Sequence, residues 1–214
     1  MTKQEAAGVK RPSPREVRRQ QRIELSREQM LETAEELFAE RGYYGTSLKD
    51  VAERCEFSVG SIYSFFDSKD ALYLAVLMRR GSGQRAEMDR LAAAGTPAGE
   101  RLAAMVKAEL ELRRKYPAWG RLQARMTKIG GLAAADVPEA YQDFHREIVD
   151  LLAGVIADGQ RAGTIRPGDP PALARLCCAL IDGFTLMDPM VGDEPEGLNA
   201  EEFLAFVRET FTPR

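Results

Sequence analysis

A short run of small and polar side chains has the composition needed to read DNA. The run comprises Ser58, Val59, Gly60, Ser61 and Ser64. Hydroxyl groups bind phosphate oxygens and base edges, and a valine can contact a thymine methyl group. The apolar residues Ile62, within the run, and Phe66, just after it, are four residues apart. This spacing would place both on one side of a short helix and hold that side to a core. An ordinary helical cluster with no DNA role fits this pattern equally well.

Residue types that carry catalysis or bind metals are scarce. His145 is the single histidine, so a histidine-rich metal site is excluded, and HExxH, Walker, GxSxG and paired CxxC motifs are missing. Three cysteines, two of them adjacent at Cys177 and Cys178, predict reduced thiols rather than a disulfide framework. We therefore expect no enzyme, no metal and no cofactor, although a helical enzyme that works with carboxylates alone remains an alternative.

The elements around the polar run are expected to be helices. Helical periodicity extends over almost the whole chain and predicts an all-α fold of about nine helices. Residues 61–66 favour a strand in isolation, but helical patterns flank them on both sides. Helix starts are predicted at Ser13 and Ser26, and the sequence leaves open whether these begin one helix or two.

Two very short helices with a three-residue turn between them form the plan of a helix-turn-helix. The first starts near Thr46 and ends before Cys55, and the second is capped by Ser58. A further helix begins near Lys69 and would brace the pair. The second short helix would then enter a major groove about 12 Å wide.

A connected series of motifs gives a family resemblance. Residues 37–47 (LFAERGYYGTS), 50–52 (DVA), 60–66 (GSIYSFF) and 68–72 (SKDAL) resemble the tetracycline-repressor-like (TetR) family. The match extends from Met30 to Leu74, whereas residues 163–166 and 179–184 match the last helices of the family only in layout. The resemblance implies an N-terminal three-helix DNA-binding domain and a C-terminal helical domain that binds a ligand and dimerises.

The resemblance also implies which side chains contact DNA. Family members usually bind phosphates with a hydroxyl at the start of the first short helix, here Thr46 or Ser47. They also use a tyrosine and a lysine, which correspond to Tyr63 and Lys69. The alternatives are a half-buried core role for Tyr63 and a solvated position for Lys69. The base edges would face the second short helix, and the full expected interface is Thr46, Ser47, Ser58, Val59, Gly60, Ser61, Tyr63, Ser64 and Lys69.

Two residues depart from the family pattern. Glu56 stands where the family commonly has glycine, at a turn position that favours a positive φ. Ser64 and Phe65 stand where the family often has tyrosine and histidine, which puts one or two phosphate contacts in doubt. Neither departure removes the predicted fold.

The chain is expected to divide into three parts. Residues 1–25 form a basic, partly disordered arm, residues 26–72 the DNA-binding domain, and residues 73–214 the effector-binding and dimerisation domain. The whole chain has a net charge of −3, but the arm concentrates positive charge in Lys10, Arg11, Arg15, Arg18, Arg19 and Arg22. This arm could follow the DNA backbone or remain a solvated tail, and the sequence leaves both open.

The C-terminal part is expected to bind an unknown small molecule and to form a homodimer through its last two helices, 173–187 and 199–211. Candidate pocket residues combine aromatic, apolar and polar side chains: Trp119, Leu122, Met126, Tyr141, Phe144 and His145. Each of them could equally be an ordinary core residue. No membrane span is expected, and the predicted location is cytoplasmic.

These observations together predict a ligand-responsive transcriptional regulator. The favoured form is a repressor that binds a palindromic operator as a dimer and is released by a small molecule. The alternatives are an activator of the same family, or a helical adaptor that binds protein partners and no DNA.

Overall fold

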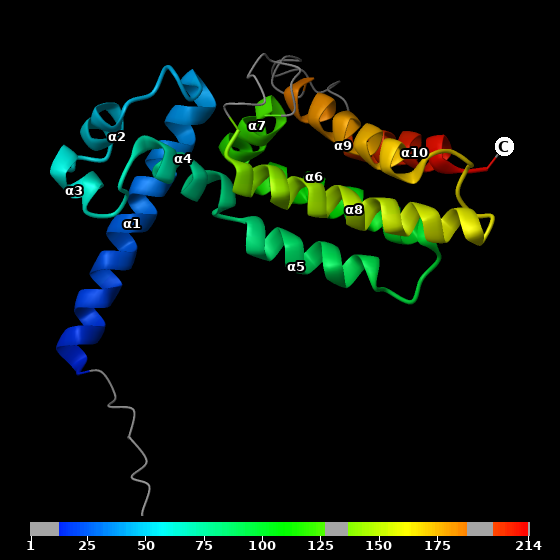
Figure 1. The fold of residues 1–214 in the computed structure, drawn as a ribbon, viewed down its shortest axis with the longest axis horizontal. Helices are drawn as coiled ribbons and strands as arrows, with labels where there is room; N and C mark the ends of the chain where they lie inside the picture. The colour runs from blue at the N-terminus through cyan, green and yellow to red at the C-terminus, as the bar shows by residue number, and fades with distance from the viewer. Residues whose placement is uncertain (1–12, 127–136, 188–198, 214) are drawn as a thin grey trace, which may run out of the picture.

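The computed structural model describes residues 13–126, 137–187 and 199–213, and within them the chain is all α-helical. Figure 1 shows two parts, an N-terminal head of α1 to α4 and an elongated bundle of the later helices. The helices of the described residues are α1 (Pro14–Arg41), α2 (Leu48–Arg54), α3 (Val59–Tyr63), α4 (Lys69–Met78), α5 (Gly81–Ala92), α6 (Ala98–Lys115), α7 (Pro117–Met126), α8 (Glu139–Arg161), α9 (Pro170–Met187) and α10 (Ala200–Phe211).

The first helix is continuous over 28 residues, which answers the question left open by its two start signals. Ser13 accepts from the Glu16 amide while Glu16 bonds back to Ser13, so a capping box begins the helix at the earlier signal. Gly42, with φ 73°, ends it. The expected boundary after residue 25 therefore falls inside α1, and residues 1–12 of the arm lie outside the described residues.

Serine caps begin the three short helices of the head. Ser47 caps α2 and forms a capping box with Asp50, Ser58 caps α3, and Ser68 caps α4. Each serine hydroxyl accepts a main-chain N–H that would otherwise lack a partner in the first turn. Residues 61–66, which favour a strand in isolation, belong to α3 and the turn after it.

The described residues form ten helices, in keeping with the expectation of about nine. The chain after α4 turns at Arg79–Arg80 and continues as the separate helix α5, which the sequence analysis did not distinguish from α4. Gly81 at the start of α5 lies against Phe144, since a Cβ there would be 3.4 Å from the phenyl ring. The start of α5 is therefore packed directly on α8.

The hydrophobic core is divided in two, and both clusters extend to the same helix, α8. The first cluster contains the inward faces of α1 to α4 together with Leu122, Met126 and Tyr141 from the bundle. The second is built from α5, α6, α8, α9 and α10. Phe144 packs against both clusters, so the head and the bundle are not independent packing units.

A buried ion cluster also joins the head to the bundle. The Glu35 carboxylate on α1 accepts from Arg79 at 3.1 Å and from Arg80 at 3.4 Å. Arg79 binds Glu28 on α1 as well. The pKa of Arg79 is raised, because the attraction of the Glu28 and Glu35 carboxylates is larger than the opposing effect of burial. The turn between α4 and α5 is thus fixed to α1 by charge as well as by packing.

Helix α9 is long and apolar enough, by length and composition, to cross a membrane. The core helix of a protein that never enters a membrane meets the same criteria. In this structure α9 packs on α8, α7 and α6, and it carries the buried acid Asp182. We therefore read α9 as a bundle helix with one uncovered apolar side.

The turn between α1 and α2 should not tolerate a side chain at Gly45. A Cβ there would lie 2.4 Å from the Arg41 carbonyl oxygen, a backbone atom that cannot move without disturbing the end of α1. We expect Gly45→Ala to lower the free energy of unfolding by about 2 kcal/mol in urea titrations. Gly83→Ala is the control, because that α5 position is open and alanine should stabilise by up to about 1 kcal/mol. Equal effects of both variants would contradict the expected clash.

Candidate functional site

Helix α3 has the two-sided surface that the sequence predicts. Ile62 is fully buried and Phe66 is 4% exposed, so these side chains hold the helix to the head core. Val59 is 38% exposed and Gly60 is open, with only the Ser58 hydroxyl within 4 Å of a Cβ placed there. Ser58 also bonds Ser61, both through the Ser61 amide and hydroxyl to hydroxyl at 2.8 Å. The outward side is therefore small and polar, and lies at the outer edge of the head (Figure 1).

The turn before α3 adopts the conformation expected of the family despite its unusual residue. Glu56 has a φ of 59°, which only a few per cent of non-glycine residues adopt. The following amide, that of Phe57, donates to the Ala52 carbonyl at 2.9 Å and closes the turn. The positive φ expected at this turn position is therefore present, with glutamate in place of the usual glycine.

Of the two candidate hydroxyls at the start of α2, only one is accessible. Thr46 is 2% exposed, and its hydroxyl lies within hydrogen-bond distance of the Leu37 and Gly42 carbonyls, at 3.2 and 3.0 Å. The expectation that Thr46 contacts DNA is therefore corrected, because its hydroxyl is used to join α1 to α2. Ser47 is exposed at the helix start, where it shares the Asp50 carboxylate.

Tyr63 and Lys69 differ in the exposure of their side chains to solvent. Tyr63 is 54% exposed, so it is not the half-buried core aromatic of the alternative interpretation. The Lys69 ammonium lies 4.0 Å from the centre of the Tyr43 ring and is partly desolvated, which lowers the pKa of that lysine. The Ser64 hydroxyl donates to the Ser61 carbonyl at 2.7 Å.

A small inner cavity of about 40 Å³ lies between the helices of the bundle. At about 10–15 Å³ for each water molecule, this space holds only a few waters. Its lining comes from α5, α6, α7, α8 and α9 and comprises Gln84, Met88, Met105, Val106, Glu109, Arg113, Gln123, Tyr141, Phe144, His145, Ile148, Leu152, Cys178 and Ile181. Three of the six candidate pocket residues, Tyr141, Phe144 and His145, thus line a common cavity.

The other three candidate pocket residues serve a different purpose. Trp119, Leu122 and Met126 do not line this cavity but lie buried between α7 and the head. The Trp119 indole donates to the Leu77 carbonyl at 3.2 Å, and the Tyr73 hydroxyl lies 2.9 Å from the Met126 sulfur. These side chains attach the bundle to α4, so their assignment to the pocket is corrected.

A buried charged cluster beside the cavity, of which Glu109 and Arg113 line it, was not among the predicted site residues. Arg113 donates to Glu109 and to Asp182, each at 2.7 Å, and all three are at most 9% exposed. The pKa of Arg113 is raised, because its two carboxylate partners stabilise the charged guanidinium by more than burial destabilises it. Two signals in the sequence could have revealed this cluster. Glu109 and Arg113 are one helical turn apart, and Asp182 is the one acidic residue in the largely apolar segment 170–187.

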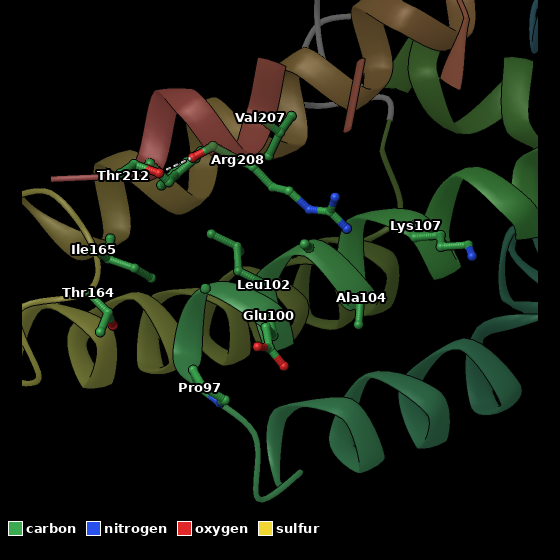
Figure 2. Close-up of a pocket in the computed structure, with 13 residues that line it drawn as sticks. Pro97, Glu100, Leu102, Ala104, Lys107, Thr164, Ile165, Val207, Arg208 and Thr212 are labelled. Atoms are coloured by element: carbon green, nitrogen blue, oxygen red, sulfur yellow. Dashed lines mark hydrogen bonds between the residues drawn. The ribbon is translucent and has the colours of Figure 1, made fainter. Parts of the chain in front are cut away.

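A larger and more open groove of about 610 Å³ lies at the far end of the bundle. Figure 2 shows it between α6 and α10, with Leu102 and Val207 among its apolar walls and Glu100, Lys107 and Arg208 among its polar ones. No predicted site residue lines this groove. Neither Tyr141 nor Phe144 reaches it, so it lacks the contact with the head core that the inner cavity has.

Comparison with known families accounts for both parts of the chain. A family model described as bacterial regulatory proteins of the tetR family matches residues 30–76. A second, described as the C-terminal part of BetI-type transcriptional repressors, matches residues 97–211, more than half of the chain. The chain belongs to the TetR family of transcriptional regulators. The resemblance in the head motifs is thereby confirmed, as are the all-α fold and the helix-turn-helix.

Individual relatives agree with this assignment. The chain is 27% identical over 169 residues to the HTH-type transcriptional regulator YhgD of Bacillus subtilis, covering 77% of this chain and 87% of YhgD. A solved structure of a regulator from Saccharomonospora viridis in complex with choline is 25% identical. It has a TM-score of 0.64, and the match covers 87% of this chain and 95% of that one. AibR in complex with isovaleryl coenzyme A and operator DNA is 20% identical, with a TM-score of 0.69 and coverage of 87% and 98%.

The glutamate in this TetR-family turn should cost stability. We expect Glu56→Gly to raise the free energy of unfolding by roughly 1 kcal/mol, because glycine adopts φ 59° without the Cβ clash. Glu53→Gly in α2 is the matched control and should lower it by a similar amount, since glycine is unfavourable within a helix. Urea titration of the two variants checks the signs. A loss of stability in both would contradict the inferred strain.

Proposed function

We propose that this TetR-family regulator is a cytoplasmic repressor that binds a palindromic operator as a homodimer and is released by a small molecule. The observation that carries the proposal is the shared packing of α8. Tyr141 and Phe144 line the inner cavity and also pack against the core of the head. A molecule that enlarges the cavity must therefore move side chains that pack against the core of the head.

In this proposal α3 lies in the major groove of DNA. Val59, Gly60 and Ser61 meet base edges, while Ser47 and Tyr63 bind phosphates on either side. Ser58 and Ser64 are closer to structural roles, because their hydroxyls already make local hydrogen bonds. Lys69 reaches a phosphate only if its ammonium leaves the Tyr43 ring.

The basic arm supplies affinity that does not depend on base sequence. Arg15, Arg18, Arg19 and Arg22 are exposed on the first turns of α1, at helical spacings of three and four residues. Few residues of α3 are charged, so phosphate binding must come largely from elsewhere. A helix that presents guanidinium groups beyond the head can extend the contact along the DNA backbone (Figure 1).

The dimer is proposed to form through α9 and α10. Leu176 and Met187 on α9 and Phe206 on α10 are each at least 50% exposed. Gly183 has nothing within 4 Å of an added Cβ, so the α9 backbone is open to close approach by another helix. Two copies packed through these helices would form a four-helix bundle. The two α3 helices of the dimer would then face the same side of the DNA.

Release follows from the size of the cavity. About 40 Å³ does not admit an effector, so binding requires α5, α6 and α8 to separate. A ligand that binds only this expanded state shifts the population toward it, and a preference of a few kcal/mol is sufficient. In the expanded state Phe144 shifts against the core of the head, and the distance between the two α3 helices of the dimer changes.

The first test of this function is capture of genomic DNA fragments by the purified protein, followed by sequencing. We expect a shared palindrome, and Ser61→Asp should weaken its binding by at least about tenfold because a carboxylate there faces phosphate and base oxygens. Aspartate at this third helix position can retain the cap, as Asp50 does in α2. Ser82→Asp on exposed α5 is the control and should bind as well as the unmodified protein.

Other outcomes separate the competing functions. No enriched sequence with the ligand-stripped, refolded protein would refute DNA binding and favour an adaptor that binds protein partners. An enriched palindrome whose gene is less transcribed when the regulator is deleted would indicate an activator. Increased transcription on deletion supports the repressor.

The contribution of the arm is measurable as salt dependence. Replacing Arg15, Arg18 and Arg22 by alanine should reduce the slope of log K against log salt by about 0.9 for each phosphate that these arginines neutralise. The control replaces Arg90 and Arg161, which are 64% and 73% exposed on the bundle, and should leave the slope unchanged. An unchanged slope in the arm variant would show that the arm remains solvated in the DNA complex and contacts no phosphates. Fluorescence anisotropy with labelled operator gives both slopes.

A further inference from the structure

Helix α3 carries none of the side chains that distinguish bases through characteristic hydrogen bonds. Arginine, lysine, asparagine, glutamine and the acids can each recognise a base by the donors and acceptors that it presents in the major groove. The segment from Ser58 to Ser64, which is α3 with its two caps, contains none of these residue types. A helix of this composition must distinguish DNA sequences in another way.

The serine hydroxyls of this segment discriminate poorly between bases. The Ser58 hydroxyl accepts from the Ser61 amide at 3.0 Å, and the two hydroxyl oxygens lie 2.8 Å apart, so one of their two protons is used within the pair. The Ser64 hydroxyl donates to the Ser61 carbonyl at 2.7 Å. A hydroxyl group both donates and accepts, so the bonding capacity that remains suits either kind of base edge. These serines therefore do not specify a sequence by themselves.

Val59 is the apolar side chain that α3 exposes at its start. It is the first residue of the helix and is 38% exposed, whereas Ile62 is fully buried in the core of the head. In a helix-turn-helix, the N-terminal residues of the second helix contact base edges. The apolar group that a base presents in the major groove is the 5-methyl group of thymine. Contact between a valine methyl and this group removes apolar surface from water and is therefore favourable.

Gly60, the next residue, is not required by the fold. It is not among the glycines with a positive φ, and a Cβ there would meet only the Ser58 hydroxyl oxygen, at 3.8 Å. Alanine would therefore fit at this position, and within a helix alanine is more favourable than glycine. The contacts of the described residues give no reason for glycine here, whereas close approach by a molecule outside the chain does.

Charged side chains near α3 do not replace the missing hydrogen-bonding groups. The Lys69 ammonium lies 4.0 Å from the centre of the Tyr43 ring. Glu56, in the turn before α3, is exposed, but the phosphates on both sides of a major groove repel a carboxylate. A carboxylate would in any case recognise the amino group of cytosine and not a methyl group, so the two kinds of recognition can be told apart.

We propose that Val59 recognises the 5-methyl group of a pyrimidine in each half-site, and that this methyl group is the main feature by which α3 distinguishes sequences. This rests on the proposed function, in which α3 lies in the major groove. Gly60 lets the helix approach the base pair closely, and Val59 contacts the methyl group. The recognised class of DNA is therefore defined by a methyl group and not by one base pair. Thymine carries this group, and 5-methylcytosine carries it at the same ring position.

The test uses the palindrome recovered by capture of genomic fragments, bound to the full-length protein and followed by fluorescence anisotropy. Each thymine is replaced by deoxyuridine at the symmetry-related positions of both half-sites, which removes only the methyl group. We expect one pair of positions at which the affinity falls at least about tenfold, because each lost methyl contact costs about fourfold. The other thymine positions should be unaffected. Equal binding of thymine and uracil at every position would refute methyl recognition.

At the sensitive pair of positions, the methyl group can be tested apart from the base pair. The T·A pair is replaced by C·G and then by a pair of 5-methylcytosine with guanine. We expect methylation of cytosine to raise the affinity by about the factor that uracil lowers it. Equal binding of cytosine and 5-methylcytosine would contradict the proposal. Tighter binding of unmethylated cytosine would overturn it in favour of recognition by the Glu56 carboxylate.

A shortened side chain assigns the contact to Val59. In Val59→Ala the ratio of thymine to uracil affinity should fall from about tenfold to about twofold, because alanine buries less of the base methyl group. Val17→Ala is the matched control, since Val17 is 39% exposed on α1, and it should leave the ratio unchanged. Thermal melting monitors folding. A folded Val59→Ala protein that keeps the full ratio would show that another side chain contacts the methyl group.

A variant of Gly60 separates DNA binding from folding. Gly60→Ala should raise the melting temperature, because alanine favours a helix, and yet weaken operator binding at least about tenfold, because its Cβ holds the bases away from α3. Gly83→Ala on α5 is the control: its surroundings are also open, so it should raise the melting temperature without changing operator binding. Unchanged operator affinity in Gly60→Ala would contradict the close approach on which the methyl contact depends.

Failure of this inference and failure of the proposed function give different results. An operator that is bound without any methyl preference refutes the role of Val59 and leaves the repressor standing. A methyl preference in a protein that activates transcription, or that no small molecule releases, supports the inference and refutes that part of the proposed function. A chain that binds no DNA refutes both.

Discussion

Two aromatic side chains of α8 lie between the inner cavity and the head of α1 to α4 and contact both. Tyr141 and Phe144 line the cavity, and both also belong to or pack against the hydrophobic cluster of α1 to α4. Close-packed interiors do not deform continuously, so a displaced side chain must be accommodated by movement of a whole helix. Trp119 and Met126 of α7 also contact α4, so α4 is held by both α7 and α8.

Charge is buried at two places, and at each it joins separate parts of the chain. At the junction, Glu35 is compensated by Arg79 and Arg80, which fixes the orientation of α1 relative to the α4–α5 turn. Beside the cavity, Arg113 on α6 pairs with Glu109 on the same helix and with Asp182 on α9. Buried ion pairs contribute little net stability but penalise any arrangement that separates them. The first cluster therefore specifies how α1 meets the α4–α5 turn, and the second how α6 meets α9.

On the proposed DNA-facing surface, affinity and specificity come from different helices. The exposed part of α3 is small and largely uncharged, which suits close approach to base edges and gives little phosphate attraction. Positive charge lies instead on the first turns of α1, where capping at Ser13 continues the helix well beyond the head core. In the proposed complex, this division would make the affinity for DNA sensitive to salt without altering the base sequence that α3 recognises.

The sequence by itself determined the local features of this protein. Serine caps at Ser47, Ser58 and Ser68, the turn at Glu56 and the two-sided pattern of α3 depend on neighbours within a few residues, and all were predictable. Only the tertiary structure decided which aromatic residues line the cavity, that Thr46 is buried, and that Arg113 meets Asp182. The last pair is separated by 69 residues, and periodicity shows only that a residue faces inward. Which inward faces meet depends on how the helices pack.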